Sequence, residues 1–195
     1  MAHEHDAHAG DEGHHAHDLE GVGVAVATVS SSRSIDDDPS GDRIVTAVEE
    51  AGFEVATREL IPDEYDVIQR SIDAFTRRDD VDVVITTGGT GVTPDDVTVE
   101  AVTALFEKEL PGFGELFRRL SYEEIGTRTV GSRAIAGIAD NVVVFCLPGS
   151  TDAVELGTES IIVDVAPHLA GLATPTPESA DSAETDDAPD AGTSE

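Results

Sequence analysis

One segment of the sequence, Thr86–Gly91, is rich in glycine and threonine and directly follows an apolar run. Glycine permits a positive φ and lets the backbone approach a ligand closely. Exposed backbone amides and threonine hydroxyls could then hold a phosphate group. No Gly-Lys-Ser/Thr sequence follows, so the segment is not a P-loop. A tight structural turn would explain the same residues, and the segment alone leaves phosphate binding open.

Two adjacent carboxylates, Asp95 and Asp96, come after this loop and before Val97-Thr98. Asp is favoured at helix N-caps, which would explain them structurally. The same pair also suits Mg²⁺, which prefers one or two carboxylates together with substrate phosphates. Such a metal would neutralise charge at a reacting phosphorus. The local residues leave the cap and the metal site equally open.

Two further loops have similar chemistry. Leu60–Glu64 contains Pro62 and Asp63 after a second apolar run, and Leu147–Asp152 precedes the last helical pattern. Asp63 could simply cap the helix that follows it, whereas helix N-termini also bind anions. In α/β folds, ligands bind beyond the carboxyl ends of the strands. Three such loops at one edge therefore indicate a shared site rather than three unrelated turns.

The elements that must position these loops alternate along the chain. Predicted strands are Val22–Val29, Phe53–Leu60, Val81–Thr86 and Val142–Leu147. Predicted helices are Asp42–Ala51, Glu64–Arg78, Asp96–Glu109, Gly112–Ile125 and Thr151–His168. This alternation predicts an α/β fold with a largely parallel sheet that is covered on both faces.

The two ends differ in composition from the centre. Of 195 residues, 39% are apolar, which suits one folded domain over residues 19–172. Residues 1–18 are polar and hold six of the seven histidines, and residues 173–195 are acidic and contain no basic residue. Neither end can bury enough apolar surface to offset its ordering entropy, so we expect disordered tails. The histidines are explained by a solvated tail or by binding of Zn²⁺, Ni²⁺ or Cu²⁺.

The charge of the chain excludes some partners. Its formal net charge is -30, from 41 acidic and 11 basic residues. Nucleic acids and anionic membranes need a basic surface, so neither is an expected partner. The acidity is typical of a halophilic protein, for which salt of roughly 1 M reduces the Debye length to about 3 Å. No signal peptide and no apolar stretch of ~20 residues is visible, and the predicted location is cytoplasmic.

The single cysteine, Cys146, excludes an intrachain disulfide. It lies in the apolar run Val142–Leu147, which indicates a core residue rather than a nucleophile.

Four blocks together resemble the MoaB/MogA family of molybdenum cofactor biosynthesis proteins. The segment Thr86–Thr98 reads TTGGTGVTPDDVT, like the family's signature. Leu110–Glu115, Ser132–Ala134 and Leu147–Ser150 match three further blocks, in the same order and with the same spacing over about residues 22–170.

The resemblance implies a three-layer α/β/α fold that assembles as a homotrimer or homohexamer. It implies a molybdopterin adenylyltransferase, which transfers AMP from Mg-ATP to molybdopterin and releases pyrophosphate. Asp63 and Asp96 match the catalytic carboxylates, which act there through Mg²⁺ and the phosphates. The implied nucleotide- or molybdopterin-binding residues are Ser40, Gly41, Thr87, Gly88, Gly89, Thr90, Gly91, Thr98, Glu115, Gly149 and Ser150.

Two departures from the family pattern keep alternatives open. Asp95 stands where many adenylylating relatives carry arginine, and Ser32 precedes Arg33 where many carry Asp. A non-catalytic molybdopterin-binding or carrier protein is therefore a second hypothesis. The segment Thr93–Asp96 also resembles CinA-type proteins, which gives a nucleotide hydrolase as a third.

The stripe Phe113, Leu116, Phe117 and Leu120 has helical spacing. It is explained by contact with another subunit or by packing on its own sheet.

Overall fold

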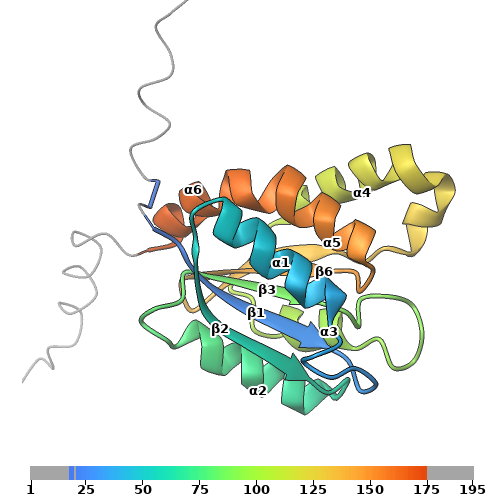
Figure 1. Cartoon of the computed structure of the whole chain (residues 1–195), viewed down its shortest axis with the longest axis horizontal. Helices are drawn as coiled ribbons and strands as arrows, with labels where there is room; N and C mark the ends of the chain where they lie inside the picture. The colour runs from blue at the N-terminus through green and yellow to red at the C-terminus, as the bar shows by residue number, and fades with distance from the viewer. Residues whose placement is uncertain (1–17, 20, 175–195) are drawn as a thin grey trace, which may run out of the picture.

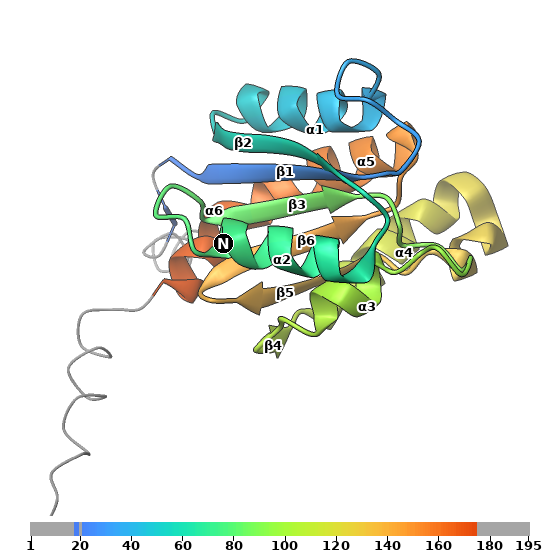
Figure 2. The same cartoon turned by 90° about the horizontal axis from the view of Figure 1, so that it is seen from below.

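A computed structural model describes residues 18–19 and 21–174. The predicted tails lie almost entirely outside these residues. The strands form one sheet in the order β2-β1-β3-β6-β5-β4 (Figures 1 and 2). Strands β1, β2, β3 and β6 run parallel, β5 is antiparallel to β6, and the short β4 is antiparallel to β5. Their bounds are β1 Gly23–Val29, β2 Glu54–Ile61, β3 Val83–Thr87, β4 Lys108–Glu109, β5 Ile135–Ala139 and β6 Val142–Leu147.

Helices cover both faces of the sheet, which confirms the predicted three-layer α/β/α fold (Figure 1). One face carries α1 Pro39–Glu50, α4 Pro111–Ile125, α5 Thr151–Gly157 and α6 Val163–Ala173. The other face carries α2 Tyr65–Thr76 and α3 Thr98–Thr103. A 3₁₀ turn, Gly126–Gly131, follows α4, and a π-helical turn, Thr158–Ile162, joins α5 to α6.

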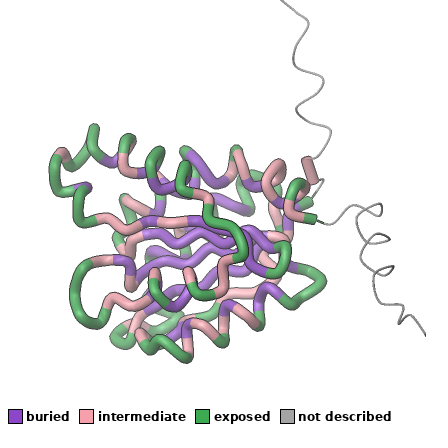
Figure 3. Tube along the Cα trace, turned by 180° about the vertical axis from the view of Figure 1, so that it is seen from behind, coloured by how far each residue is buried: buried purple, intermediate pink, exposed green. Residues whose placement is uncertain are grey.

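Two hydrophobic clusters lie on opposite faces of the sheet, whose strands are mostly buried (Figure 3). Ile44, Phe117 and Ile162 belong to the cluster under α1, α4 and α6, and Ile68 and Ala101 to the one under α2 and α3. Because inward-facing residues occupy both sides of the central strands, those strands appear in the sequence as continuous apolar runs.

The extent of one predicted helix is wrong. Instead of Asp96–Glu109, the helix α3 has only six residues, and the chain continues as the edge strand β4. The Glu107 N–H donates to the Ile138 carbonyl and the Leu110 N–H to the Ala136 carbonyl, at 2.9 and 2.8 Å. Pairing with β5 thus replaces the helical hydrogen bonds that the local pattern indicated.

Strand β5 itself was not predicted, although a signal for it exists. It is joined to β6 by Asp140 and Asn141, both with positive φ (50° and 63°). Asn and Asp tolerate this conformation, and a two-residue loop of this kind favours a hairpin. The predicted final helix is likewise interrupted by the π-helical turn, and it ends at Ala173.

The aromatic stripe of α4 packs mainly on its own sheet. Phe113 and Phe117 are buried, and the Phe113 ring lies 5.0 Å from that of Phe145, edge to face. Leu116, by contrast, is 40% exposed. The prediction that Cys146 is a core residue is confirmed, because it is fully buried and burial raises the pKa of its thiol to about 12. Within the described residues, no helix is both long and apolar enough to cross a membrane.

Candidate functional site

The glycine-rich loop after β3 requires its glycines. Gly88 and Gly89 have positive φ, 101° and 64°. A Cβ at Gly88 would lie 2.3 Å from the backbone oxygen of Val29, so the loop passes against the end of β1. The Gly88 N–H donates to the Leu147 carbonyl, whereas the N–H groups of Gly89 and Thr90 donate to no acceptor within the described residues. Two neighbouring amides of this loop therefore have no hydrogen-bond acceptor within the described residues.

Two buried threonines of the signature, Thr87 and Thr98, make hydrogen bonds that fix this loop. Thr87 and Thr98 are completely buried. The Thr87 hydroxyl donates to the Pro148 carbonyl at 2.9 Å, and the Thr98 N–H donates to the Gly89 carbonyl at 3.0 Å. The first contact connects the loops after β3 and β6, and the second connects the loop after β3 to the start of α3. Direct contact of either side chain with a ligand stays a prediction.

Asp96 closes a turn rather than capping a helix. Its Oδ2 accepts hydrogen bonds from the Thr93 N–H (2.8 Å) and the Thr93 hydroxyl (2.6 Å), and the residue at the N-cap of α3 is Val97. The hydrogen bond from the Thr93 side chain is the largest cause that lowers the pKa of Asp96, against a smaller opposing effect of burial. The nearby charge of Arg133 lowers it further. Asp96 is therefore ionised at neutral pH, as a metal ligand must be.

Arg133 holds this turn in place. Its Nε donates to the Gly91 carbonyl at 2.7 Å, and one terminal nitrogen donates to the Asp96 carbonyl at 2.9 Å. The guanidinium also pairs with Glu100. Arg133 appeared in the sequence only as part of a matched block. Its contacts could not be predicted because it lies 37 residues beyond Asp96 in the chain.

A cavity of about 400 Å³, which we name the loop cavity, opens where these loops meet. From the predicted site, Gly89, Thr90, Gly91, Asp96, Gly149 and Ser150 line it. Its other lining residues are Phe117, Ser121, Ile125, Arg128, Gly131, Ser132, Pro148 and Ala153. The second half of α4 and the 3₁₀ turn thus form a wall that the sequence did not predict.

Ser40 and Gly41 lie beside the loop cavity, at the start of α1. The Ser40 hydroxyl donates to the Gly149 carbonyl at 3.0 Å, and Arg33 donates to the same oxygen at 3.4 Å. Gly41 has no room for a side chain, because a Cβ there would lie 2.1 Å from the carboxylate of Asp38. Ser40 therefore positions the loop after β6, whereas Gly41 packs against Asp38 at the start of α1.

Asp38, absent from the predicted site, is a buried carboxylate at this junction, with 1% of its surface exposed. It accepts hydrogen bonds from the Thr28 hydroxyl (2.6 Å), the Gly41 N–H (3.1 Å) and Arg58 (3.0 Å). Burial alone would raise the pKa of Asp38, but these hydrogen bonds together outweigh burial and lower it. The start of α1 is thus fixed by a charged group with all its partners in place.

Asp63 lies on the β2 side of the same sheet edge. Its Oδ2 accepts a hydrogen bond from the Ser31 N–H at 2.6 Å, and its own N–H donates to the Ser31 hydroxyl at 3.0 Å. Asp63 does not line the loop cavity, so only one of the two predicted catalytic carboxylates, Asp96, lies in it. Glu115 is also elsewhere, in a cavity of about 200 Å³ beside Arg118.

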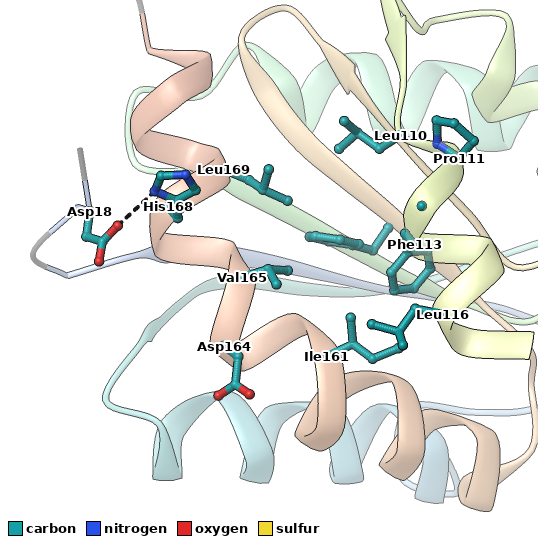
Figure 4. Close-up of a pocket in the computed structure, with 12 residues that line it drawn as sticks. Asp18, Leu110, Pro111, Phe113, Leu116, Ile161, Asp164, Val165, His168 and Leu169 are labelled. Carbon is teal, nitrogen blue, oxygen red and sulfur yellow. Dashed lines mark hydrogen bonds and ion pairs between the residues drawn. The ribbon is translucent and has the colours of Figure 1, made fainter. Parts of the chain in front are cut away.

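A larger, more apolar cavity of about 620 Å³, which we name the apolar groove, lies between α4 and α6 (Figure 4). Leu110, Phe113, Leu116, Val165 and Leu169 line it, with Asp18 and His168 3.1 Å apart at one end. Its lining includes neither arginine nor lysine. It therefore lacks the guanidinium and ammonium groups that commonly bind phosphate.

The described residues contain no group of three or more His, Cys, Asp or Glu side chains placed to hold a metal ion. Mg²⁺ requires less from the protein, since it keeps waters and takes one or two carboxylates plus substrate phosphates. An ionised Asp96 in the loop cavity fits that requirement.

Known proteins share both the sequence and the fold. The family model described as "Probable molybdopterin binding domain" matches residues 25–168. "Molybdenum cofactor biosynthesis protein B" of Bacillus subtilis (strain 168) is 46% identical over 149 residues, covering 76% of this chain and 88% of that protein. The protein of the same name from Escherichia coli (strain K12) is 44% identical over 146 residues, covering 75% and 84%.

A solved structure, "Crystal structure of Molybdenum cofactor biosynthesis protein B", superposes with a TM-score of 0.77 at 42% identity. The match covers 79% of this chain and 96% of the other.

Proposed function

Because this chain belongs to the MoaB/MogA family of molybdenum cofactor biosynthesis proteins, we propose that it binds molybdopterin and adenylylates it with Mg-ATP. In this reaction a phosphate oxygen of molybdopterin forms a bond to the α-phosphorus of ATP. The bond from that phosphorus to the bridging oxygen breaks, and pyrophosphate leaves with the electron pair. The enzyme is a nucleotidyltransferase in this proposal.

One observation supports the proposal above the others. In the loop cavity, two backbone amides without an acceptor among the described residues, those of Gly89 and Thr90, lie beside the ionised carboxylate of Asp96. Amides bind phosphate oxygens, and a carboxylate beside them binds the cation that accompanies a nucleotide. The apolar groove offers no comparable combination.

The protein's contribution to the reaction is positioning and charge. The amides of Gly89 and Thr90 would hold the phosphates, and Arg133 keeps that loop in place. Asp96 and Asp63 would hold Mg²⁺, which, when bound, neutralises charge at the reacting phosphorus. Asp63 is suited to this role because its Oδ1 accepts no hydrogen bond within the described residues. Gly149 and Ser150 would contact the pterin side of the substrate.

The test is to incubate the protein with molybdopterin, Mg²⁺ and ATP and to measure the adenylate by mass and pyrophosphate by a coupled assay. Equal amounts of both are expected, and omission of Mg²⁺ should stop their formation. Binding of molybdopterin without either product would reject adenylyl transfer.

A second function, that of a non-catalytic carrier of molybdopterin, is favoured by a specific observation. Asp63 does not line the loop cavity, and Asp95 adds an exposed carboxylate beside it. A carrier needs the cavity but not a metal between two loops. It would bind molybdopterin with the same affinity in the presence and absence of Mg-ATP.

We propose a homotrimer or homohexamer as the assembly, on the resemblance to the family. Light scattering in molar KCl should give a mass that is a multiple of three subunits. A strictly monomeric protein that forms the adenylate would show that one chain builds the whole site.

A further inference from the structure

Most arginines of this acidic chain form ion pairs or hydrogen bonds within the protein. Six of the ten form ion pairs with carboxylates: Arg33, Arg43, Arg58, Arg77, Arg78 and Arg133. Two more, Arg70 and Arg118, donate to the backbone carbonyls of Asp66 and Ala134. Only Arg119 and Arg128 make neither an ion pair nor a side-chain hydrogen bond within the described residues, although the chain has 41 acidic residues.

Arg128 is the one of these two that lines the loop cavity. It belongs to the 3₁₀ turn after α4, and its side chain is exposed. Gly89, Thr90 and Asp96 line the same cavity, so an unpaired guanidinium shares the space with two free amides and one ionised carboxylate. Arg119 lies on α4 and does not line this cavity.

We propose that Arg128 binds a phosphate group of the substrates in the loop cavity. The assignment rests on the proposed function, because that function brings phosphates to this cavity. A guanidinium presents donors in a planar fork that matches two phosphate oxygens. It also supplies positive charge close to a site from which Asp95 and the net charge of -30 repel phosphates. Arg128 thereby supplies the positive charge that is missing at position 95, where this chain has Asp.

Two sources of phosphate meet in this reaction, the triphosphate of ATP and the phosphate of molybdopterin. The test therefore measures the Kd of three probes by titration calorimetry in molar KCl: inorganic pyrophosphate, ATP with Mg²⁺, and molybdopterin. The variants are Arg128→Gln, Arg128→Lys and the matched control Arg119→Gln, which removes the same charge from an exposed position outside the cavity. Melting temperatures verify that all variants fold.

Arg128→Gln should raise the Kd of at least one probe by about tenfold, the size of a lost charge-assisted hydrogen bond. Arg128→Lys should recover part of the affinity, because charge returns without the fork. Arg119→Gln should bind like the wild type. A loss for pyrophosphate and ATP would assign Arg128 to the nucleotide, and a loss confined to molybdopterin would assign it to the pterin substrate.

Unchanged affinity of Arg128→Gln for all three probes would overturn the proposal, as would an equal loss in Arg119→Gln, which would indicate only the overall charge. These outcomes are separate from the failure of the proposed function. A wild-type protein that forms no adenylate, but whose affinity for molybdopterin depends on Arg128, would reject adenylyl transfer and retain this phosphate contact.

Discussion

The loop cavity and the apolar groove share one helix, α4, but offer opposite chemistry. The first half of α4, with Phe113 and Leu116, faces the groove, whereas Phe117 and Ile125 face the loop cavity. The groove is the larger, about 620 against 400 Å³, and neither arginine nor lysine lines it. The loop cavity has free amides, a carboxylate and Arg128. The proposed site therefore follows from the chemistry of the lining residues and not from the size of the cavity.

The largest effect should come from Asp96 and Asp63. Asp→Asn at either position should reduce the rate of adenylate formation by about 100-fold or more, because a charge that holds the metal is lost. Asn keeps the size of the side chain and still accepts the hydrogen bonds of the turn. Single-turnover assays give the rate, and circular dichroism verifies the fold. Near-normal rates in both variants would contradict a catalytic role of the two carboxylates, and unfolding of both would indicate a structural role instead.

Next in size is the effect of Asp38 on the stability of the protein, because this buried carboxylate fixes the start of α1. Asp38→Ala should cost about 3 kcal/mol, as for breaking a buried ion pair. Asp42→Ala is the control, since Asp42 pairs with the same Arg58 but has a 65% exposed side chain. It should cost less than about 1 kcal/mol. Denaturant unfolding measures both, and equal costs would show that Asp38 is not the residue that fixes α1.

The same carboxylate predicts a pH dependence. Folding lowers the pKa of Asp38, so its contribution to stability is present above the ordinary carboxyl pKa and is lost as pH falls through the lowered value. Stability of the wild type should fall on acidification from neutral pH, and Asp38→Ala should show a smaller fall. Parallel pH profiles for the two proteins would contradict this account.

Salt should have a smaller effect that acts on the whole surface. Melting temperature and activity should rise from dilute buffer to molar KCl, because self-repulsion among the carboxylates is screened. Both are measured along one KCl series. A melting temperature and activity that are already maximal in dilute buffer would exclude adaptation to salt as the reason for the acidity.

Removal of the chain ends should have the smallest effect on activity and stability. It alters the apolar groove and leaves the loop cavity intact. Deletion of residues 1–18 and 174–195 removes Asp18, and with it the Asp18–His168 contact of the groove, but no residue of the loop cavity. Adenylate formation should be unchanged, with little change in melting temperature. A large loss of activity would mean that an end of the chain contributes to the site.

The sequence predicted the features of the fold that depend on local pattern. Strand β6 was predicted to the residue, and the α/β layers followed from alternation. Strand β4 was missed because it depends on contacts of Glu107–Leu110 with β5, which no local periodicity records. Strand β5 was missed although the Asp140-Asn141 loop marks its hairpin with β6.

The residues of the candidate site also fall into those that local sequence predicts and those that depend on contacts distant in the chain. Gly88 and Asp96 were predicted from local residue types and the family blocks. The contacts of Asp38 and Arg133 and the position of Arg128 in the cavity lining come from other elements and could be seen only in the structure. The separation of Asp63 from the loop cavity could not be predicted either, because order along the chain does not give the distance between two loops.

The most direct test of the central claim is amide hydrogen exchange with and without molybdopterin. Both cavities are then observed in one experiment. We predict protection of residues 88–91, 125–132 and 149–153, which border the loop cavity, and unchanged exchange of residues 110–116 and 164–169 along the apolar groove. Protection confined to the groove would contradict the assignment of the substrate to the loop cavity.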